Sequence, residues 1–240
     1  MNYQLINPPS PPEKHEAIAN VTRQAMATLK PPPRLKISEW ADLARRLSSE
    51  SSAEAGIWHT SRAEYQRGIM DAISDPQIRD VVVMAGAQVG KTEMLLNCIG
   101  FHIAHDPAPI LLVQPTLEMA QAFSKDRLAP MLRDTPELRG KVKDPRTRDS
   151  NNTTSHKVFP GGHISLVGSN SASGLASSPI RIVLCDETDR YPASAGSEGD
   201  PIQLARKRSA TFWNRKIVMV STPTNKGASR IEADRKSTRL

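Results

Sequence analysis

A loop of small residues that ends in Gly-Lys-Thr constrains the fold of this chain more than any other feature. The loop runs from Ala85 to Thr92, after an apolar run at residues 81–84 and before a helix-like stretch that begins at Glu93. A strand, a loop and a helix in this order direct successive backbone N–H groups, and the positive end of the helix dipole, at a phosphate chain. The pattern predicts a nucleotide-binding loop formed by Gly86, Ala87, Gln88, Val89, Gly90, Lys91 and Thr92.

Two residues of this loop have individual roles to expect. Lys91 would reach the outer phosphates of ATP, and Thr92 would ligate Mg²⁺. The usual pattern opens with glycine, whereas this loop opens with Ala85 and has Gly86 one place later. Gly-Lys-Thr also occurs by chance, so the flanking strand and helix are what favour a phosphate loop.

A second apolar run, at residues 181–185, is too short and too β-branched for a helix and predicts a buried strand. It ends in Asp186 and Glu187. Beside a phosphate loop, Asp186 can hold the magnesium shell, while Glu187 can orient or deprotonate the attacking water. The alternative is a strand that ends in an acidic turn. That interpretation is the simpler one for the run alone, but the upstream Gly-Lys-Thr favours ATP hydrolysis.

A third apolar run, at residues 216–220, ends in a polar tip that continues to Thr224. In ATPases of the additional-strand type, such a tip lies near the γ-phosphate and reports its loss. The alternative is a strand that ends in a proline turn. The order of this run after the other two favours a coupling role for Ser221, Thr222 and Pro223.

Strands and helices alternate along the chain. Further strands are expected at residues 110–114 and in a hairpin at 157–167, and helices at 63–74, 92–105 and 117–133. Gln114, at the tip of its strand, fits either a DNA-contacting loop or a plain strand terminator. The alternation implies an α/β fold with a mostly parallel sheet covered by helices on both faces. With the phosphate loop, it predicts a P-loop NTPase of the additional-strand, RecA-like type.

The N-terminal part of the sequence has a different composition. Residues 1–34 are rich in proline and are expected to form a loosely attached arm around a helix-like stretch at 13–29. A helix with Ser38 as its N-cap is expected next. Its apolar face would consist of Ile37, Trp40, Leu43, Ala44 and Leu47.

Cysteine usage and hydropathy limit the class of protein. Cys98 and Cys185 lie in apolar runs and are expected to be buried free thiols, which suits a reducing cytoplasm. The sequence has no secretory signal and no apolar stretch of about 18 residues, so neither secretion nor membrane spanning is indicated. The six histidines show no metal-ligand spacing and are interpreted as structural.

The net charge of +7 is unevenly distributed. Residues 206–240 contain ten Lys and Arg against two Asp and Glu, a net charge of +8. A basic end suits a polyanion such as DNA. A solvated face without a ligand is an equally good interpretation. The candidate DNA-binding residues are Arg206, Lys207 and Arg208.

The ordered set of motifs resembles the large terminase subunit of tailed phages, the packaging ATPase of the lambda-like GpA type. The resemblance spans roughly residues 35 to 232 and is strongest in Asp186-Glu187-Thr188-Asp189-Arg190-Tyr191-Pro192, an extension more specific than Asp-Glu alone. The other matching stretches are Ile37 to Asp42, Val82 to Glu93, Ser173 to Arg181, Ser221 to Thr224 and Gly227 to Ile231.

The resemblance implies an ATPase that drives double-stranded DNA into an empty viral capsid in the host bacterial cytoplasm. The implied partners are the terminase small subunit and the capsid portal, the active form is a homo-oligomer, and no membrane is involved. In related motors, residues upstream of the phosphate loop read the adenine, and the matching positions are Tyr65 and Gln66. The alternative for these two is the ordinary first turn of a surface helix.

Two departures from the family pattern matter. Members continue into a nuclease domain, whereas this sequence ends at Leu240. We therefore interpret residues 35–232 as the ATPase domain and 233–240 as a truncated tail, and expect no DNA cleavage. Many terminases also carry an arginine in the loop where this chain has Ala87. The charge-stabilising arginine is then expected from elsewhere in the chain or from a neighbouring subunit. If the same chain supplies it, Arg79 and Arg181 are the candidates.

The sequence thus predicts a motor domain in which Lys91 neutralises the charge of the departing phosphate and Glu187 positions the water. Two alternatives stay open. A helicase-like DNA translocase shares the Asp-Glu motor core and would separate the strands of a forked duplex. A catalytically idle fragment that binds DNA or capsid would show no ATPase stimulation on assembly.

Overall fold

The computed structural model describes residues 16, 18–23, 26, 34–52, 54–143, 152–176 and 178–237. The chain divides into two units, Met1–Arg34 and Leu35–Leu240. In the first unit, residues 16, 18–23 and 26 are helical, and the rest of the helix expected at 13–29 lies outside the described residues. The second unit contains every residue predicted above to form a site.

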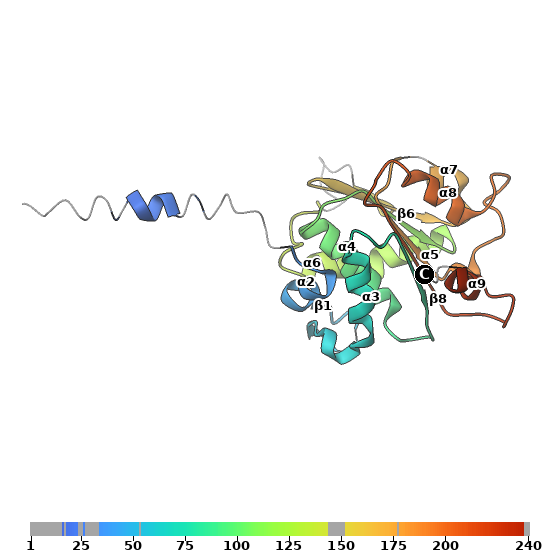
Figure 1. The fold of residues 1–240 in the computed structure, drawn as a ribbon, viewed down its shortest axis with the longest axis horizontal. Helices are drawn as coiled ribbons and strands as arrows, with labels where there is room; N and C mark the ends of the chain where they lie inside the picture. The colour runs from blue at the N-terminus through green and yellow to red at the C-terminus, as the bar shows by residue number, and fades with distance from the viewer. Residues whose placement is uncertain are drawn as a thin grey trace, which may run out of the picture. The chain divides into compact units, whose positions relative to one another are not determined.

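A six-stranded sheet lies at the centre of the second unit, in the order β3-β8-β7-β4-β6-β5 (Figure 1). Neighbouring strands are parallel except β5, which is antiparallel to β6. The predicted, mostly parallel sheet is therefore confirmed. The strands are β3 (Asp80–Met84), β4 (Ile110–Gln114), β5 (His156–Phe159), β6 (Gly162–Gly168), β7 (Ile182–Asp186) and β8 (Lys216–Ser221).

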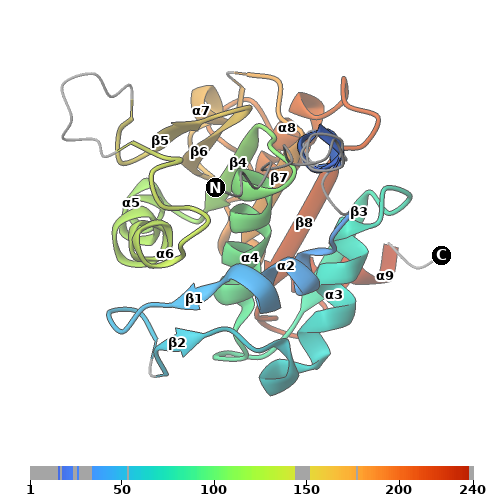
Figure 2. The ribbon, with the colours of Figure 1, turned by 90° about the vertical axis from the view of Figure 1, so that its left-hand side faces the viewer.

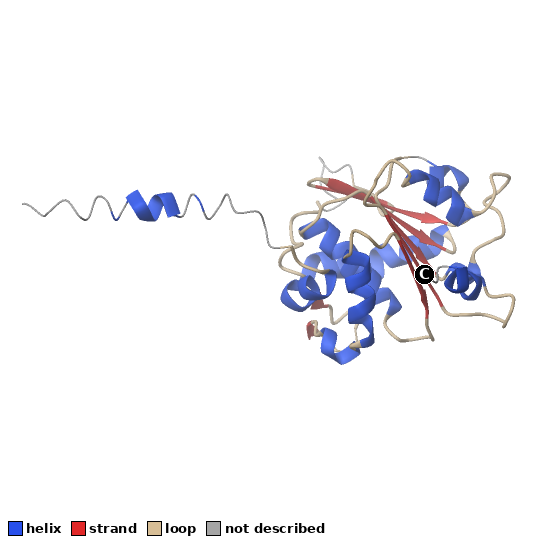
Figure 3. Ribbon diagram, viewed as in Figure 1, coloured by secondary structure: helices blue, strands red, loops and turns tan. Residues whose placement is uncertain are grey.

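Helices cover both faces of this sheet, as a buried parallel sheet requires (Figure 3). Consecutive β4 residues alternate between two cores: Ile110 and Leu112 belong to one, Leu111 and Val113 to the other. The second core includes α7 (Ala172–Ala176), α8 (Pro201–Arg208) and α9 (Arg230–Ser237). The first includes α2 (Ile37–Ala44), α3 (Tyr65–Ser74), α4 (Lys91–Ala104), α5 (Leu117–Phe123) and α6 (Ala129–Asp134).

The start of the second unit differs from its prediction. The N-cap of α2 is Lys36, so Ser38 is not the cap, and Glu39 Oε2 instead accepts the Lys36 N–H at 2.8 Å. Leu43 is 68% exposed. Leu47 lies beyond the helix in β1 (Arg46–Leu47), which pairs with β2 (Gly56–Ile57). The predicted apolar face is confirmed for Ile37, Trp40 and Ala44, which are buried. It is wrong for Leu43, which faces solvent, and for Leu47, because the backbone becomes extended at Arg45 and ends the helix.

The helix expected at residues 117–133 is interrupted by a π-helical turn, Ser124–Leu128, between α5 and α6. Pro130 follows this turn and lacks the N–H that would continue the regular ladder, which accounts for the wider turn. Likewise, α3 begins at Tyr65 after a short 3-10 turn, Thr60–Ala63.

Both cysteines are buried free thiols, as predicted. Burial raises the pKa of Cys98 and of Cys185 to about 12, so neither thiol ionises near neutral pH. In the part of the chain that the structure describes, no helix has the length and apolarity needed to cross a membrane.

Candidate nucleotide-binding site

Four strand ends meet at one edge of the sheet. β3 ends at Met84, β4 at Gln114, β7 at Asp186 and β8 at Ser221. The pairing places Met84 opposite Ser221, and Asp186 opposite Val220, so the strand ends are level. Because parallel strands direct their carboxyl ends to the same edge, the loop after β3 lies beside the acidic pair after β7. The fold thus brings together three motifs that are far apart in the sequence.

The loop between β3 and α4 turns at two residues with positive φ. These are Gln88, with φ of 58°, and Gly90, with φ of 74°, which is the N-cap of α4. A Cβ atom at position 90 would also lie 2.5 Å from Gln66 Nε2, so glycine is required there. The first N–H groups of α4 have no helical acceptor and, with the helix dipole, favour an anion at this end.

Lys91 connects this loop to two other elements. Its Nζ donates to the Gly86 carbonyl oxygen at 2.7 Å and to Thr222 Oγ1 at 2.8 Å. The same ammonium lies 3.6 Å from Glu187 Oε1. The residue is only 9% exposed, so these contacts are made largely out of water. One cation therefore joins the loop, the acidic pair and the tip of β8.

The two acidic residues have different surroundings. Asp186 is buried, and Gln114 Nε2 donates to its Oδ2 at 3.0 Å. Burial raises the pKa of Asp186 above its ordinary value, although the Gln114 hydrogen bond and the charge of Lys91 act in the opposite direction. Glu187 Oε2 accepts the Thr222 N–H at 3.5 Å. Gln114 at the end of β4 thus contacts Asp186, the first residue of the acidic pair.

Backbone strain is concentrated at this site. Among the described residues, the only non-glycine residues with positive φ are Gln88 and Glu187, whose φ is 52°. Such conformations are unfavourable for residues with a Cβ atom and persist where the surrounding structure imposes them. At Glu187, the turn ends β7 abruptly and directs the carboxylate toward Lys91 and Thr222.

The tip of β8 is held by the residues that follow the acidic pair. Ser221 is buried, and its Oγ accepts the Asp189 N–H at 3.1 Å. The Ala85 N–H donates to the Ser221 carbonyl oxygen at 3.2 Å, so strand pairing extends into the phosphate loop. Thr222 contacts Lys91 as described, whereas Pro223 is exposed. The predicted coupling segment therefore lies at the site.

Tyr65 and Gln66 also contact the loop. The Tyr65 hydroxyl donates to the Val89 carbonyl oxygen at 2.8 Å, and Gln66 Nε2 donates to the same oxygen at 3.0 Å. Tyr65 is 61% exposed, whereas Gln66 is 3% exposed and also lies 3.4 Å from the Gly90 carbonyl oxygen. An ordinary surface turn does not describe Gln66. Its role toward an adenine stays a prediction.

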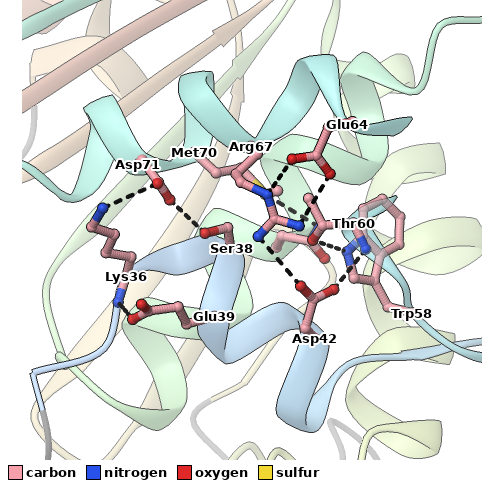
Figure 4. Close-up of polar contacts among 11 residues, drawn as sticks. Lys36, Ser38, Glu39, Asp42, Trp58, Thr60, Glu64, Arg67, Met70 and Asp71 are labelled. Carbon is pink, nitrogen blue, oxygen red and sulfur yellow. Dashed lines mark hydrogen bonds and ion pairs between the residues drawn. The ribbon is translucent and has the colours of Figure 1, made fainter. Parts of the chain in front are cut away.

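A polar network fixes α3, which carries these two residues, against α2 (Figure 4). Asp71 of α3 accepts a hydrogen bond from Ser38 Oγ. Arg67 binds Glu64 at 2.5 Å and lies 3.7 Å from Asp42 of α2. α2 itself lies between α3 and α4 (Figure 2). The helix pair thus holds Gln66 over the loop.

A buried ion pair makes a second connection to α4. Arg45 Nη2 donates to Glu93 Oε2 at 2.9 Å, and Glu93 lies in the first turn of α4 beside Thr92. Burial lowers the pKa of Arg45, and the Glu93 carboxylate opposes this effect. The residues are 48 positions apart. Sequence reasoning missed this contact because no local spacing marks such a pair.

The two arginines considered as internal sources of charge are in the wrong place. Arg79 immediately precedes β3 and Arg181 immediately precedes β7, so both lie at the sheet edge opposite the phosphate loop. Arg181 is also engaged there, because its Nη2 lies 2.6 Å from Asp106 Oδ2. Neither arginine is placed to serve the site of its own chain.

The basic triad predicted to bind DNA ends α8. Arg206 forms an ion pair with Asp80 at 2.5 Å. Arg208 Nε donates to the Leu175 carbonyl oxygen at 3.2 Å. Lys207 is exposed, so it is the most available of the three charges. The helix start missed in the sequence has a recognisable signal, since Asp200 caps it and Pro201 occupies its first position.

The fold and the strand-tip geometry define a class of protein. β8 lies between β3, which leads into the phosphate loop, and β7, which carries the acidic pair, and it is the additional strand of the additional-strand P-loop NTPases. Residues 52–239 match the family model described as phage terminase large subunit gpA, ATPase domain. The chain belongs to this family, which confirms the lambda-like resemblance.

Relatives and a solved structure agree with the assignment. The terminase large subunit of Enterobacteria phage P21 is 32% identical over 203 residues, which cover 84% of this chain and 31% of the relative. The terminase large subunit of Escherichia phage lambda is 31% identical over 205 residues, which cover 85% of this chain and 31% of that relative. The chain thus spans about a third of their length. The bacteriophage HK97 large terminase shares the fold, with a TM-score of 0.64 at 12% identity, covering 85% of this chain and 41% of that chain.

Proposed function

We propose that this chain is the ATP-hydrolysing motor domain, residues 35–232, of a DNA-packaging terminase that translocates double-stranded DNA into the procapsid. The observation that most supports this proposal is the position of the Lys91 ammonium. This group touches the phosphate loop at Gly86, the acidic pair at Glu187 and the β8 tip at Thr222. A hydrolytic site needs these three parts within reach of one γ-phosphate. Family membership supports the same conclusion.

The residues fit ATP with Mg²⁺. Oxygen ligands are those that Mg²⁺ prefers, and Thr92 and Asp186 supply a hydroxyl and a carboxylate. Asp186 is buried with a raised pKa, and a divalent cation would favour its charged form. When bound, the ion would neutralise charge on the β- and γ-phosphates. Within the described residues, no cluster of three or more His, Cys, Asp and Glu offers another metal site.

The chain's own groups have distinct tasks in this proposal. Lys91 exchanges its Thr222 and Gly86 contacts for phosphate oxygens and stabilises the charge that develops as the bond breaks. Glu187 orients the attacking water and accepts its proton. The free α4 N–H groups and the loop residues 86–90 hold the phosphates, while Tyr65 and Gln66 contact the adenine.

Partners follow from the family. A terminase acts with double-stranded DNA, a small subunit and the capsid portal, in the host cytoplasm, and we propose these for this chain. Ala87 and the positions of Arg79 and Arg181 favour an arginine from a neighbouring subunit, hence an active homo-oligomer. The acidic pair is common to terminases and helicase-like translocases, and family membership favours the terminase.

ATP turnover measured with and without linear duplex DNA tests the proposal. We expect turnover that requires Mg²⁺ and rises when duplex is added. A forked duplex serves as control, because a packaging motor leaves its strands paired. Strand separation would favour the helicase-like translocase, and absence of turnover at every protein concentration would favour the idle fragment.

A further inference from the structure

Asp189, two residues after Glu187, binds several backbone and side-chain donors with one carboxylate. Its Oδ2 accepts the Thr224 N–H at 2.8 Å and the Thr224 hydroxyl at 3.0 Å. Its Oδ1 accepts the Ile231 N–H at 2.7 Å. Its own N–H donates to Ser221 Oγ at 3.1 Å. One residue thus joins the acidic loop to both ends of the segment between β8 and α9.

These bonds complete a chain of contacts that starts at the phosphate loop. Lys91 donates to Thr222, and Thr224, two residues later, is held by Asp189. Asp189 in turn holds Ile231 in the first turn of α9. Ile231 is fully buried in the second core, so a shift of this backbone would carry the helix with it.

The bonds to Asp189 suit a charged carboxylate. Partial burial acts to raise its pKa, but hydrogen bonds from Ile231, Ser229 and Thr224 outweigh it and lower the pKa below its ordinary value. The carboxylate therefore stays ionised near neutral pH, where it also interacts favourably with the N-terminal end of α9. Hydrogen bonds to an ionised acceptor are the stronger kind.

α9 is placed to pass a movement onward. It packs against β3, the strand that leads into the phosphate loop. Arg235 of α9 lines a groove of about 390 Å³ together with residues of α3 and β3, among them Ile69 and Val82. A shift of α9 would therefore alter a surface at the free edge of the sheet.

We propose that Asp189 is the positioning residue that links the Lys91–Thr222 contact to α9. In this proposal, α9 is the element whose position changes with the nucleotide bound and transmits that change to the rest of the molecule. The inference rests on the proposed function, because it assumes that a phosphate of the bound nucleotide competes with Thr222 for Lys91. Phosphate binding releases Thr222. The Asp189 bonds then transfer the displacement of residues 222–224 to Ile231.

The test is amide hydrogen exchange of residues 222–237, with ADP and with a slowly hydrolysed ATP analogue. In the parent chain, exchange of α9 should differ between the two nucleotides. In Asp189→Asn one of the two carboxylate oxygens becomes an NH₂, which cannot accept an N–H, so the bond from Thr224 or the bond from Ile231 is lost in either orientation of the amide. We expect α9 to exchange on the order of tenfold faster, as loss of a hydrogen bond to a charged group permits. The difference between nucleotides should disappear, with nucleotide affinity retained.

Glu232→Gln is the matched control. Like Asp189→Asn, it removes one negative charge, but this charge lies on α9 and away from the phosphate loop. Glu232 binds Lys236 at 2.7 Å and accepts the Gly227 N–H at 3.1 Å. This variant should keep the difference between nucleotides. Thr224→Val, which replaces the hydroxyl with a methyl group and leaves the backbone N–H in place, should reduce that difference and serves if Asp189→Asn does not fold.

The outcomes separate the two proposals. In one outcome, the parent chain binds and hydrolyses ATP and shows an exchange of α9 that depends on the nucleotide. If that dependence is unchanged in Asp189→Asn or Thr224→Val, only the role of Asp189 is overturned. A parent in which α9 responds to no nucleotide overturns the role of α9. A parent that binds no nucleotide overturns the proposed function, and this inference with it.

Discussion

Glu187 keeps a side chain at a backbone position that suits glycine. Its positive φ turns the chain away from β7 and leaves the carboxylate beside Lys91, at 3.6 Å. Such a conformation costs on the order of 1–3 kcal/mol in a residue with a Cβ atom. Retaining a carboxylate there is understandable if its chemistry is needed, and this supports its assignment as the base.

We expect Glu187→Gln to bind ATP with nearly parental affinity and to hydrolyse it at least about a hundredfold more slowly, because an amide cannot accept the proton of water. Equilibrium binding of a fluorescent ATP analogue and single-turnover hydrolysis measure the two effects. Glu187→Gly is a useful companion, since it should relieve strain and raise the melting temperature while remaining inactive. Parental turnover in Glu187→Gln would place water activation elsewhere.

Asp186 predicts a pH effect on stability. Its pKa is raised in the fold, so the folded state holds its proton over a pH range in which the unfolded chain has lost it. The free energy of unfolding therefore falls as pH rises from the ordinary Asp value through the folded pKa, and the penalty persists at neutral pH. Without Mg²⁺, Asp186→Asn should be more stable than the parent at pH 7, with a gain that shrinks as pH is lowered.

Thermal melts from about pH 3.5, near the ordinary Asp pKa, to pH 8, with EDTA present, measure this gain. Gln114→Leu is the control, because it removes the hydrogen bond to Asp186 while leaving the carboxylate in place, and it should lower stability. An Asp186→Asn variant that melts below the parent at pH 7 would contradict the account of Asp186 as a carboxylate stabilised only with a bound cation.

At the scale of elements, two helical glycines with different surroundings test how α2 is fixed to α4. A Cβ atom at Gly100 of α4 would lie 2.3 Å from the ring of Trp40, whereas one at Gly68 of α3 would meet no atom within 4 Å. Gly100→Ala should therefore destabilise the fold by about 1–3 kcal/mol through overpacking. Gly68→Ala should stabilise it by about 0.5–1 kcal/mol through helix propensity.

Urea unfolding of the two variants and the parent gives both free energies. Equal effects of the two substitutions would mean that the close approach of Trp40 to α4 is not maintained in solution. Trp40 belongs to α2, and α2 and α3 together hold Gln66 against the phosphate loop. Gly100→Ala should therefore also bind nucleotide more weakly, and the affinity for the same fluorescent ATP analogue measures this effect.

The elements that sequence reasoning predicted well are those governed by local pattern. Residues 110–114 form β4 as predicted, because a strand buried on both faces is one continuous apolar run. The end of α2 was missed, since Arg45 leaves the helix and contacts Glu93 in a distant element, and no local pattern marks such a contact. At the site, the loop and acidic pair are readable as motifs. The Gln114–Asp186 and Asp189–Ile231 contacts are not, since only the packed sheet creates them.

For the whole molecule, internal pairing reduces the charge that DNA can use. Residues 206–240 carry a net charge of +8. However, Arg206 pairs with Asp80, Arg230 pairs with Asp200, and Lys216 donates to the Asp75 and Ile78 carbonyl oxygens. Cations that are already engaged gain less from a phosphate. Exposed Lys207 is therefore the best placed of the predicted DNA contacts.

We expect duplex binding without sequence preference and with a steep salt dependence. Each phosphate that a cation of the protein neutralises adds about 0.9 to the steepness of the log–log slope. Lys207→Gln should reduce the steepness of the slope by about 0.9, the contribution of one phosphate. Arg206→Gln should mainly lower the stability of the fold, because it removes the ion pair with Asp80. Fluorescence anisotropy of labelled duplex across a salt series measures the slopes. Parental slopes in both variants and in the triple variant at residues 206–208 would mean that this surface is only solvated.

Phosphate release from ATP by the parent and by Lys91→Ala, purified in parallel with Mg²⁺ present, tests the central claim most directly. Lys91 joins the loop, Glu187 and Thr222, so its loss should remove about 2–4 kcal/mol of transition-state stabilisation. We predict turnover in the parent and a loss of at least about thirtyfold in Lys91→Ala, with unfolding that stays cooperative. Equal turnover in the two proteins would contradict the assignment of residues 85–92 as the ATP-binding loop.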